Sequence, residues 1–392
     1  MSKLEKLIQQ YCPDGVEYKA LGEVTIMKRG TSATKGIMQA GNIPVISGGR
    51  QPAFYCNASN RTGEVITVAG SGAGAGYVQY WNEPIFVCDA FSIQGNETLN
   101  TKYVYYVLTS IQEKIYSTKK GGGVPHVHIS SIDKFEIPVP PLPVQEEIVR
   151  VLDTFTELQA ELQAELQKRK QQYNFYRDNL LNFKDINRGG QEIKWMKLKD
   201  VATQWYRGAG IKREEVGNEG MPCIRYGEIH TSYNIWFKDC ISHTDETKQA
   251  TKKYAEYGDI LFAITSEDIP LVGNSVAYLG KEKIMVGGDI VVMKHNQDPR
   301  YMAYALSTSD AIKQKGKGKV KSKVVHTNVP SLQEIVIPIP PMEEQQRIAD
   351  ILDRFDTLTN DLTSGLPAEI EKRRQQYEFY RDKLLTFKRK EA

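Results

Sequence analysis

The sequence predicts two similar halves, each a globular domain followed by a long helix, with the two helices packed together as a coiled coil. Three observations predict this fold. A long stretch of the sequence occurs twice, and the two copies lie 200 residues apart. Each copy ends in apolar residues spaced three and four apart, and a cluster of prolines precedes each of these patterns. Self-similarity over such a distance indicates a duplicated structural unit.

The composition is that of an ordinary folded protein. At 392 residues the chain is long enough for two or three domains. Its 40% hydrophobic and 25% charged residues argue against wholesale disorder. No apolar stretch approaches the roughly 20 residues of a membrane span, and the start of the chain lacks a signal-peptide core. We therefore expect a cytoplasmic protein with no membrane partner.

The cysteines and the net charge identify no site by themselves. The five cysteines are odd in number, widely spaced and never arranged as CxxC, which argues against a disulfide framework and a zinc site. We expect them to be reduced and structural. The net charge of +3 is too small to identify a nucleic-acid-binding protein, because an average hides local patches.

The repeat is clearest at the end of each half. Residues 135–158 read FEIPVPPLPVQEEIVRVLDTFTEL, and residues 335–358 read IVIPIPPMEEQQRIADILDRFDTL. Residues 168–184, KRKQQYNFYRDNLLNFK, return at 372–388 as KRRQQYEFYRDKLLTFK, with 13 of 17 positions identical. Chance does not produce this similarity, so the two ends descend from one unit.

The repeat also extends backward through each half. Corresponding positions are Val16 and Ile193, Arg29-Gly30 and Arg207-Gly208, Gly63 and Gly258, Tyr103 and Tyr301, and His126 and His326. The halves differ mainly in their middles, where Pro44 to Gly63 spans 19 positions and Pro222 to Gly258 spans 36. The two halves thus share one pattern of elements and differ in a loop segment. This indicates that they perform two versions of the same function.

The apolar pattern that ends each half has the period of a coiled coil. In the first copy it runs from Ile148 to Phe183, 35 residues in ten steps, or 3.5 residues per step. We expect the two seams to bury each other. Their residues are Leu152, Phe155, Leu158, Leu162, Leu166, Tyr173, Tyr176 and Leu180 in the first copy, and Leu352, Phe355, Leu358, Leu362, Tyr377, Tyr380 and Leu384 in the second.

The proline clusters before the helices mark the domain boundaries, because proline fits neither a helix interior nor a central strand. The predicted parts are a first domain at 1–143, a first helix at 144–185, a second domain at 186–341 and a second helix at 342–389. The second helix has four additional residues, close to one turn, between Leu358 and Lys372. Ser364-Gly365-Leu366-Pro367 falls there, so we expect a kink or break.

The first helix contains a smaller repeat, ELQA, at residues 157–160 and 161–164, followed by ELQK at 165–168. Each four-residue unit adds about 6 Å of helix, against about 3.4 Å per base pair of DNA. The number of units could therefore adjust a spacing in steps of one or two base pairs. The alternative is simply a stable helix, since Glu, Leu, Gln and Ala all favour helix formation.

These motifs, taken in order, resemble the specificity subunit of a type I restriction-modification enzyme. The resemblance spans essentially the whole chain. It is carried by the opening LEKLIQQYCPDGVEYKALGEV, the paired GEVITVAGSGAGAG and GDILFAIT, the paired IPVPPLPVQEEIVRVLD and IPIPPMEEQQRIADILD, and the two YxFYRDxLLxFK helix ends.

The resemblance implies an α+β fold in which two mixed α/β target-recognition domains are joined by two long antiparallel helices, with pseudo-two-fold symmetry. It implies a non-catalytic subunit that reads a bipartite, asymmetric DNA site with a fixed gap. It also implies docking of two methyltransferase subunits and, through these, of the restriction motor-nuclease subunits. S-adenosylmethionine and ATP belong to those partners, so we expect no cofactor on this chain.

Cationic residues gather in one segment of each half. In the second half they are Lys313, Lys315, Lys317, Lys319, Lys321 and Lys323, and in the first half Lys119 and Lys120 stand beside a run of glycines. We interpret both segments as mobile loops that contact DNA phosphates, which supply affinity but not sequence choice. The alternative is a solvated surface loop.

Base reading requires Arg, Asn, Gln or similar side chains that reach the groove edges. Candidates lie in or beside the length-variable segments. They are Arg50, Gln51, Asn57, Asn60 and Arg61 in the first half, and Arg207, Arg225, Tyr226, Tyr233 and Asn234 in the second. Any one of them taken alone fits an ordinary surface position better than a base contact, so the prediction applies to them as a set.

Rival functions have weaker support. Gly70, Gly72 and Ala75 have the spacing of a dinucleotide-binding loop, but a strand-like YVQYWNEP comes next where a helix is required. His126 and His128 resemble a metal pair without a third ligand, and hydrogen bonding or packing explains them as well. The stronger rival is a coiled-coil scaffold that binds other proteins, which explains the seams but not the divergent loops. Basic clusters at 168–170 and 372–374 fit either a DNA or a partner surface.

Overall fold

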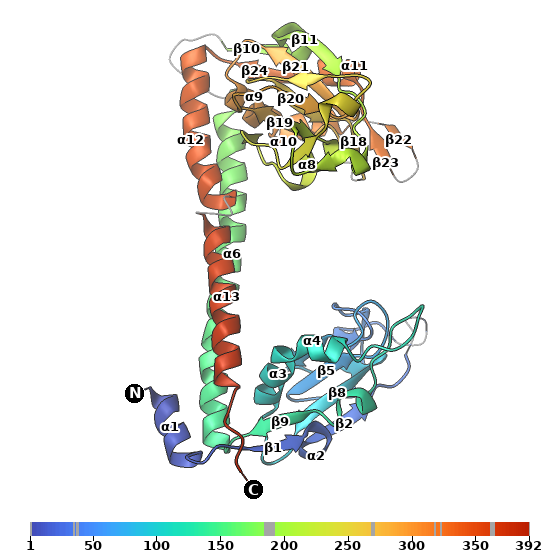
Figure 1. Cartoon of the computed structure of the whole chain (residues 1–392), viewed down its shortest axis with the longest axis vertical. Helices are drawn as coiled ribbons and strands as arrows, with labels where there is room; N and C mark the ends of the chain where they lie inside the picture. Colours follow the sequence, from blue (N-terminus) through green and yellow to red (C-terminus); the bar gives the residue numbers. More distant parts are fainter. Residues whose placement is uncertain are drawn as a thin grey trace. The chain divides into compact units, whose positions relative to one another are not determined.

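The computed structural model describes residues 2–33, 36, 39–183, 193–267, 271–316, 319–321, 324–360 and 365–391. The chain forms two compact units (Figure 1). Unit 1 comprises Met1–Leu162 together with Ile370–Ala392, and unit 2 comprises Gln163–Glu369. Each unit contains both helices and sheets, which confirms the predicted α+β fold class.

Unit 1 is built around an antiparallel sheet with the strand order β2-β8-β5-β6. Its central strand β5 is buried along its whole length, and helix α3 packs against the sheet. Strands β4-β3-β7 form a second sheet and β1-β9 a two-stranded one. The elements before the long helix are α1 (Lys3–Tyr11), β1 (Glu17–Ala20), α2 (Leu21–Val24), β2 (Thr25–Arg29), β3 (Ile43–Ile46), β4 (Phe54–Cys56), β5 (Val65–Ala69), β6 (Val78–Trp81), β7 (Phe86–Val87), β8 (Ala90–Gly95), α3 (Thr101–Ser110), α4 (Gln112–Tyr116), α5 (Ile129–Ile132) and β9 (Glu136–Val139).

Unit 2 repeats this plan with larger sheets, ordered β11-β21-β17-β19-β14 and β12-β15-β13-β20-β16, with β18-β23-β22 and β10-β24 beside them. Strands β14, β15 and β16 lie in the segment that lengthens the second half. The elements are β10 (Lys194–Lys197), α7 (Leu198–Val201), β11 (Ala202–Arg207), η1 (Arg213–Glu215), β12 (Val216–Gly217), β13 (Met221–Ile224), α8 (Tyr226–Thr231), β14 (Trp236–Phe237), β15 (Ser242–Thr244), η2 (Glu246–Lys248), β16 (Tyr254–Ala255), β17 (Ile260–Ala263), β18 (Thr265–Ser266), β19 (Ser275–Tyr278), β20 (Ile284–Val286), β21 (Ile290–His295), α9 (Pro299–Leu306), α10 (Ser309–Lys315), β22 (Lys319–Lys321), β23 (Val324–His326), α11 (Val329–Gln333) and β24 (Val336–Ile339).

The strand before each long helix is fixed in the same way in both units. Strand β9 pairs with β1 so that Pro138 lies opposite Tyr18, and β24 pairs with β10 so that Pro338 lies opposite Trp195. Proline lacks an N–H but its carbonyl still accepts. Pro138 accepts a hydrogen bond from the Tyr103 hydroxyl (3.1 Å), as Pro338 does from that of Tyr301 (2.8 Å).

The start of each long helix is also held identically. In unit 1 the buried Gln145 amide donates to the Pro140 carbonyl (2.7 Å) and accepts from the main chain of Asn100 (2.8 Å). In unit 2 Gln345 makes the same two bonds, to Pro340 (2.8 Å) and from Asp298 (3.0 Å). The duplication read from the sequence therefore extends to individual hydrogen bonds.

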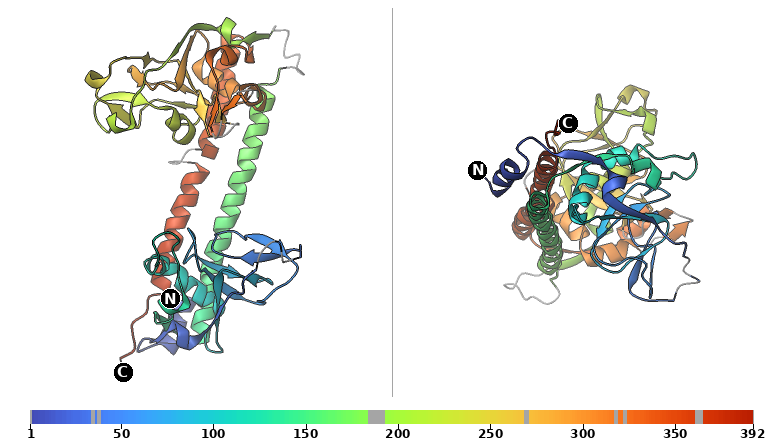
Figure 2. Two further views of the ribbon diagram at one scale, coloured as in Figure 1. Left: turned by 90° about the vertical axis from the view of Figure 1, so that its right-hand side faces the viewer. Right: turned by 90° about the horizontal axis from the view of Figure 1, so that it is seen from below.

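The long helices begin at the proline clusters, with Pro143 inside the first turn of the first helix. Helix α6 (Leu142–Leu180) is one 39-residue helix, whereas the second copy forms two helices, α12 (Met342–Asn360) and α13 (Leu366–Leu384) (Figure 2). The described helices thus end and begin on either side of the position where Gly365 and Pro367 predicted a break.

Aromatic pairs join the helices within each unit. In unit 1 Phe155 of α6 stacks on Tyr380 of α13, with ring centroids 5.6 Å apart. In unit 2 Tyr176 of α6 stacks on Phe355 of α12 at 6.0 Å. Most of the other predicted seam residues are buried or half-buried, namely Leu152, Leu162, Leu166, Tyr173, Leu180, Leu352, Tyr377 and Leu384.

Two seam predictions are wrong. Leu158 is 45% exposed and Leu358 is 61% exposed, because the inward face shifts by one residue at these levels. On α12 the next residue, Thr359, is buried instead, and its hydroxyl donates to the Phe355 carbonyl (2.9 Å). Tyr176 and Tyr380 are only partly covered by their partners, at 42% and 37% exposure. Leu362 lies outside the described residues.

The end of the chain completes unit 1. The Val16 N–H donates to the Lys388 carbonyl, and the Lys390 N–H donates back to the Val16 carbonyl, both at 2.9 Å. The Tyr18 hydroxyl donates to the Phe387 carbonyl (3.0 Å), and Arg389 pairs with Glu136 (2.7 Å). Residues nearly 370 positions apart in the sequence thus share one small assembly.

Candidate nucleic-acid interface

An identical turn follows the first strand of the main sheet in both units. Gly30 donates its N–H to the Ala90 carbonyl, and Gly208 donates to the Ile290 carbonyl, both at 2.9 Å. A Cβ on Gly30 would lie 2.0 Å from the Cys88 carbonyl oxygen, and one on Gly208 would lie 2.2 Å from that of Gly287. Both turns therefore require glycine, and each fixes the position of the arginine before it.

Alanine in place of Gly30 is expected to destabilise unit 1 by about 3 kcal/mol, since the new Cβ collides with main-chain atoms that cannot move away cheaply. Urea unfolding followed by circular dichroism measures the change. Gly122→Ala is the control, because nothing lies within 4 Å of that position, and it should stay within about 0.5 kcal/mol of wild type. Equal stability of the two variants would contradict the steric argument.

In unit 2 the turn opens onto a cavity of about 530 Å³ that gathers three arginines, Arg207, Arg213 and Arg225, together with Tyr226. The sequence predicted three of these four residues and missed Arg213, which lies in η1. Arginines that converge on one cavity offer paired N–H donors suited to guanine edges and to phosphates. This is the best candidate for a base-reading surface in unit 2.

The arginines of this cavity are held by acidic neighbours. Arg207 forms an exposed ion pair with Asp289 (2.7 Å) and donates to the Gly288 carbonyl. Arg225 lies 3.7 Å from the buried carboxylate of Glu228, and its Nε is buried without a hydrogen-bond partner among the described residues. An unsatisfied buried donor is costly unless a ligand completes it.

The equivalent cavity of unit 1 is smaller, about 230 Å³, and has different walls. It contains Arg29, Asp89, His126 and His128, with the two imidazole rings stacked at 5.9 Å. The Ser71 hydroxyl donates to Asp89. Arg29 was not among the predicted base-reading residues, although its alignment with Arg207 was the signal that could have identified it.

The first-half candidates divide into two groups. Arg50, Gln51 and Asn57 are exposed, and Arg50 lies over the ring of Tyr77 (5.0 Å). Asn60 and Arg61 instead hold the loop together, because Asn60 bonds both main-chain groups of Val87 and Arg61 donates to Ser92, Asn60 and Arg29. Asn57 also donates to the Gln39 side chain (2.8 Å), so Arg50 and Gln51 remain the better candidates to reach a ligand, whereas Asn60 and Arg61 are occupied.

The remaining second-half candidates also make internal bonds. The Tyr233 hydroxyl accepts from the Ile241 N–H (2.9 Å), and its ring stacks on Phe237 at 4.1 Å. Asn234 is exposed but donates to Asp356 of α12 (2.6 Å).

The expected cationic loop of unit 2 is partly wrong. Lys313 and Lys315 belong to helix α10, not to a mobile loop. Lys313 is exposed, whereas Lys315 is 5% exposed and cannot contact DNA from this position. Lys319 and Lys321 lie in strand β22, paired with β23. Lys317 and Lys323 lie outside the described residues.

The corresponding first-half segment carries Lys119, which lies over the ring of Tyr116 (4.1 Å), and the exposed Lys120. Lys120 exchanges main-chain hydrogen bonds with His126 (2.8 and 2.9 Å). In unit 2 His326 pairs with Thr265, and its Nδ1 lies 3.2 Å from the hydroxyl of that residue. The main chains of the aligned His126 and His326 thus take part in β-pairing in both units.

The described residues contain no cluster of three or more His, Cys, Asp or Glu side chains that could hold a metal ion. None of the described helices is long and apolar enough to cross a membrane.

Comparison with known proteins identifies the family. Residues 13–169 and 191–372 match the type I restriction modification DNA specificity domain, and the chain belongs to this family. It is a DNA-recognition subunit and not a catalytic one. The type I restriction enzyme EcoR124I/EcoR124II specificity subunit of Escherichia coli is 30% identical over 100% of this chain and 98% of its own length.

Further relatives agree. The putative type I restriction enzyme specificity subunit S.HindORF215P of Haemophilus influenzae is 29% identical over 98% of both chains. The crystal structure of a type I restriction-modification S subunit from M. genitalium has a TM-score of 0.56 and 16% identity, covering 95% of this chain and 96% of that one. A chain from a study of complex assembly and conformational transition of the type I R-M system gives 0.62 and 16%, covering 95% and 98%. Both structures share the fold.

Proposed function

We propose that each unit reads one half of a bipartite, asymmetric DNA site with a fixed gap. The proposal is supported by one contrast: the two units share the same framework of strands, helices and turns, but their arginine-lined cavities differ. The strand, helix and glycine turn are fixed by the same hydrogen bonds in both units, yet the cavities beside Arg29 and Arg207 differ in volume and lining. A common frame presents each unit to duplex DNA in one way, while different walls select different bases.

Removal of one arginine is expected to affect one half-site only. Arg207→Ala should weaken binding by roughly five- to 150-fold and relax sequence choice in the half-site read by unit 2, since a bidentate arginine contributes about 1–3 kcal/mol of discrimination. Arg29→Ala should do the same at the other half-site. Gel shifts with duplexes altered in one half-site at a time measure both effects.

The control for these variants is Arg347→Ala. Arg347 is an exposed, ion-paired arginine like Arg207, but it lies on α12 and pairs with Glu344 (2.7 Å). It should leave both half-sites unchanged. Relaxation of both half-sites by either Arg29→Ala or Arg207→Ala alone would contradict the assignment of one half-site to each unit.

The gap is proposed to be set by the ELQA units of α6. These units lie within one unbroken helix. Leu158 of the first unit is exposed, and Leu166 of the last is buried. Arg169 pairs with Glu165 one turn earlier (2.7 Å), which supports helix continuity beyond the last unit.

The same subunit type is proposed to dock twice, because the YxFYRDxLLxFK motif presents the same exposed aromatic residue in each unit. Phe175 is 64% exposed and lies edge-on to Tyr176, at 5.6 Å and 71°. Phe379 is 63% exposed and lies edge-on to Tyr380, at 5.4 Å and 75°. Exposed apolar surface marks candidate interaction sites, and aromatic side chains often anchor protein interfaces. We assign these two surfaces to two methyltransferase subunits, which carry S-adenosylmethionine and recruit the ATP-driven restriction subunits.

A gel shift on genomic fragments tests the proposal as a whole. With the methyltransferase partner present, binding should persist on a subset of fragments as salt rises from low to moderate, because only base contacts survive screening of the phosphate contacts. A scaffold that binds other proteins would show no preference among fragments at either salt concentration.

A further inference from the structure

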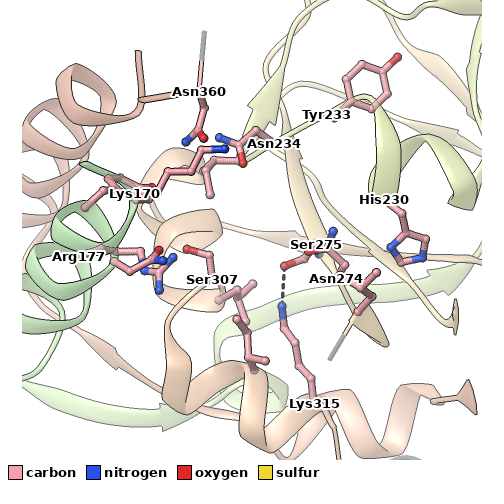
Figure 3. Close-up of a pocket in the computed structure, with 16 residues that line it drawn as sticks. Lys170, Arg177, His230, Tyr233, Asn234, Asn274, Ser275, Ser307, Lys315 and Asn360 are labelled. Atoms are coloured by element: carbon pink, nitrogen blue, oxygen red, sulfur yellow. Dashed lines mark hydrogen bonds between the residues drawn. The ribbon is translucent and has the colours of Figure 1, made fainter. Parts of the chain in front are cut away.

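Unit 2 contains a cavity of about 350 Å³ that is distinct from the arginine cavity beside Gly208 (Figure 3). Its walls come from α6, from the segment between α8 and β14, from the start of β19, and from α9 and α10. Lys170 and Arg177 reach it from α6, and Lys315 reaches it from α10. The described residues that line it include no aspartate or glutamate.

The Lys315 amine is the least expected group in this cavity. The side chain is 5% exposed, and its Nζ makes one hydrogen bond, to the Ser275 hydroxyl (2.9 Å). An ammonium group has three N–H donors, so two remain without a described protein acceptor. Burial lowers the pKa of this amine to about 7. Its other described contact is with the ring of Phe262, whose centroid lies 5.8 Å from Nζ. A bound anion would favour the protonated form of this amine.

Other polar atoms at the cavity are also unsatisfied. The Tyr173 hydroxyl and the His230 Nδ1 are buried and have no hydrogen-bond partner among the described residues. Tyr173 itself is 6% exposed. Two carboxylates beside the cavity already have partners among its lining residues: Asp178 pairs with Arg177 (2.8 Å), and Asp356 accepts from the amides of Asn234 and Asn360 (2.6 and 2.9 Å).

Unit 1 shows that the fold does not require a lysine here. Gly76 and Gly273 are equivalent, since each has a positive φ and precedes an equivalent strand, β6 or β19. A Cβ on Gly273 would lie 3.4 Å from Lys315, whereas one on Gly76 would lie 3.3 Å from Ile115 and from Tyr116. Beside this glycine, Ile115 and Tyr116 thus take the place that unit 2 gives to the aliphatic stem of Lys315.

We propose that this cavity binds the phosphate group of a small molecule. Lys170, Arg177 and the Lys315 amine converge on it. The unsatisfied Tyr173 hydroxyl and His230 ring, together with the free donors of the amine, supply hydrogen bonds that a tetrahedral oxyanion can use. Its volume is at the lower end of the range for small-molecule pockets, so the ligand has about the size of a nucleoside monophosphate. The site belongs to unit 2 alone and does not depend on how the chain reads DNA.

Isothermal titration calorimetry of the full-length chain tests the proposal, with inorganic phosphate and AMP as probes and potassium chloride holding the ionic strength constant. Saturable binding of at least one probe is expected. Lys315→Met should weaken it roughly ten- to a hundredfold, because a hydrogen bond between a cation and an anion is lost. Lys170→Met, on the other wall, is a second variant with little risk to the fold and should also weaken binding.

Substitutions at two exposed lysines serve as matched controls. Each substitution removes one positive charge but does not alter a residue that lines the cavity. Lys313→Met lies on the same helix as Lys315, and Lys168→Met on the same helix as Lys170. Both should bind the probes as wild type does. Absence of saturable binding, or equal affinity in Lys315→Met and Lys313→Met, would overturn the proposal. Loss of DNA affinity in Lys315→Met would assign the amine to the DNA backbone and would also overturn it.

Discussion

Alanine at both Phe175 and Phe379 is expected to abolish DNA methylation by the assembled enzyme while leaving the chain folded. Both side chains are nearly two-thirds exposed, so their removal leaves no cavity in the core. A central interface phenylalanine contributes about 2 kcal/mol or more, which corresponds to at least about 30-fold weaker docking at each site. Transfer of labelled methyl groups from S-adenosylmethionine measures the activity, and native mass spectrometry measures the composition of the complex.

The single variants make this prediction sharper. Phe175→Ala and Phe379→Ala should each give a complex with one methyltransferase subunit instead of two. Tyr55→Ala and Tyr257→Ala are the controls, because these tyrosines are 56% and 66% exposed but lie outside the duplicated motif. A double variant that still assembles with two methyltransferase subunits at unchanged affinity would rule out the two aromatic surfaces as the docking sites.

Deletion of one ELQA unit, residues 161–164, is expected to shorten the gap of the recognised site by one or two base pairs and to leave both half-sites unchanged. The deletion removes about 6 Å of helix and rotates the remainder of the helix by about 40°, a small change that the helix pairing can absorb. Methylation at the original sites should be lost and new sites should appear. Assigning the modified adenines of a host genome measures this directly.

The matched control keeps the length and changes the sequence. Replacing residues 161–164 by four alanines maintains a strong helix, so the gap should remain as in wild type. An unchanged gap after the deletion would show that the units stabilise the helix without measuring distance. A changed gap in the alanine variant would show that side chains, and not length, determine the spacing.

The sequence predicted best those parts of the fold that the repeat makes explicit. The proline clusters, Gln145 and Gln345, and the aligned Tyr103 and Tyr301 all act as structural equivalents, because identical local sequence makes identical hydrogen bonds. The helix seams were predicted from period alone. The period of the apolar residues predicts which residues share a helix face, but not where that face turns away from the partner helix. Leu158 and Leu358 were therefore wrongly predicted to face inward.

The candidate site was less predictable, because the sequence does not show whether a polar side chain faces solvent or forms hydrogen bonds within the protein. Asn60 and Arg61 hold a loop together, and only the fold shows their partners. Lys315 belongs to a run with lysine at every second position, yet the helix turns it into the interior. Arg213 was overlooked, although the interval from Arg207 to Pro222 is as long as that from Arg29 to Pro44 and aligns it with another basic residue, Lys35.

The strand-like pairing of Val16 with Lys388 and Lys390 has a consequence for biosynthesis. A ribosome releases the residues of unit 2 as one continuous stretch, whereas unit 1 also needs residues 370–392, which are translated after unit 2. The domain made first is therefore finished last. A premature stop codon that removes only the tail should damage reading by the amino-terminal domain, although that domain is encoded far upstream of the lesion.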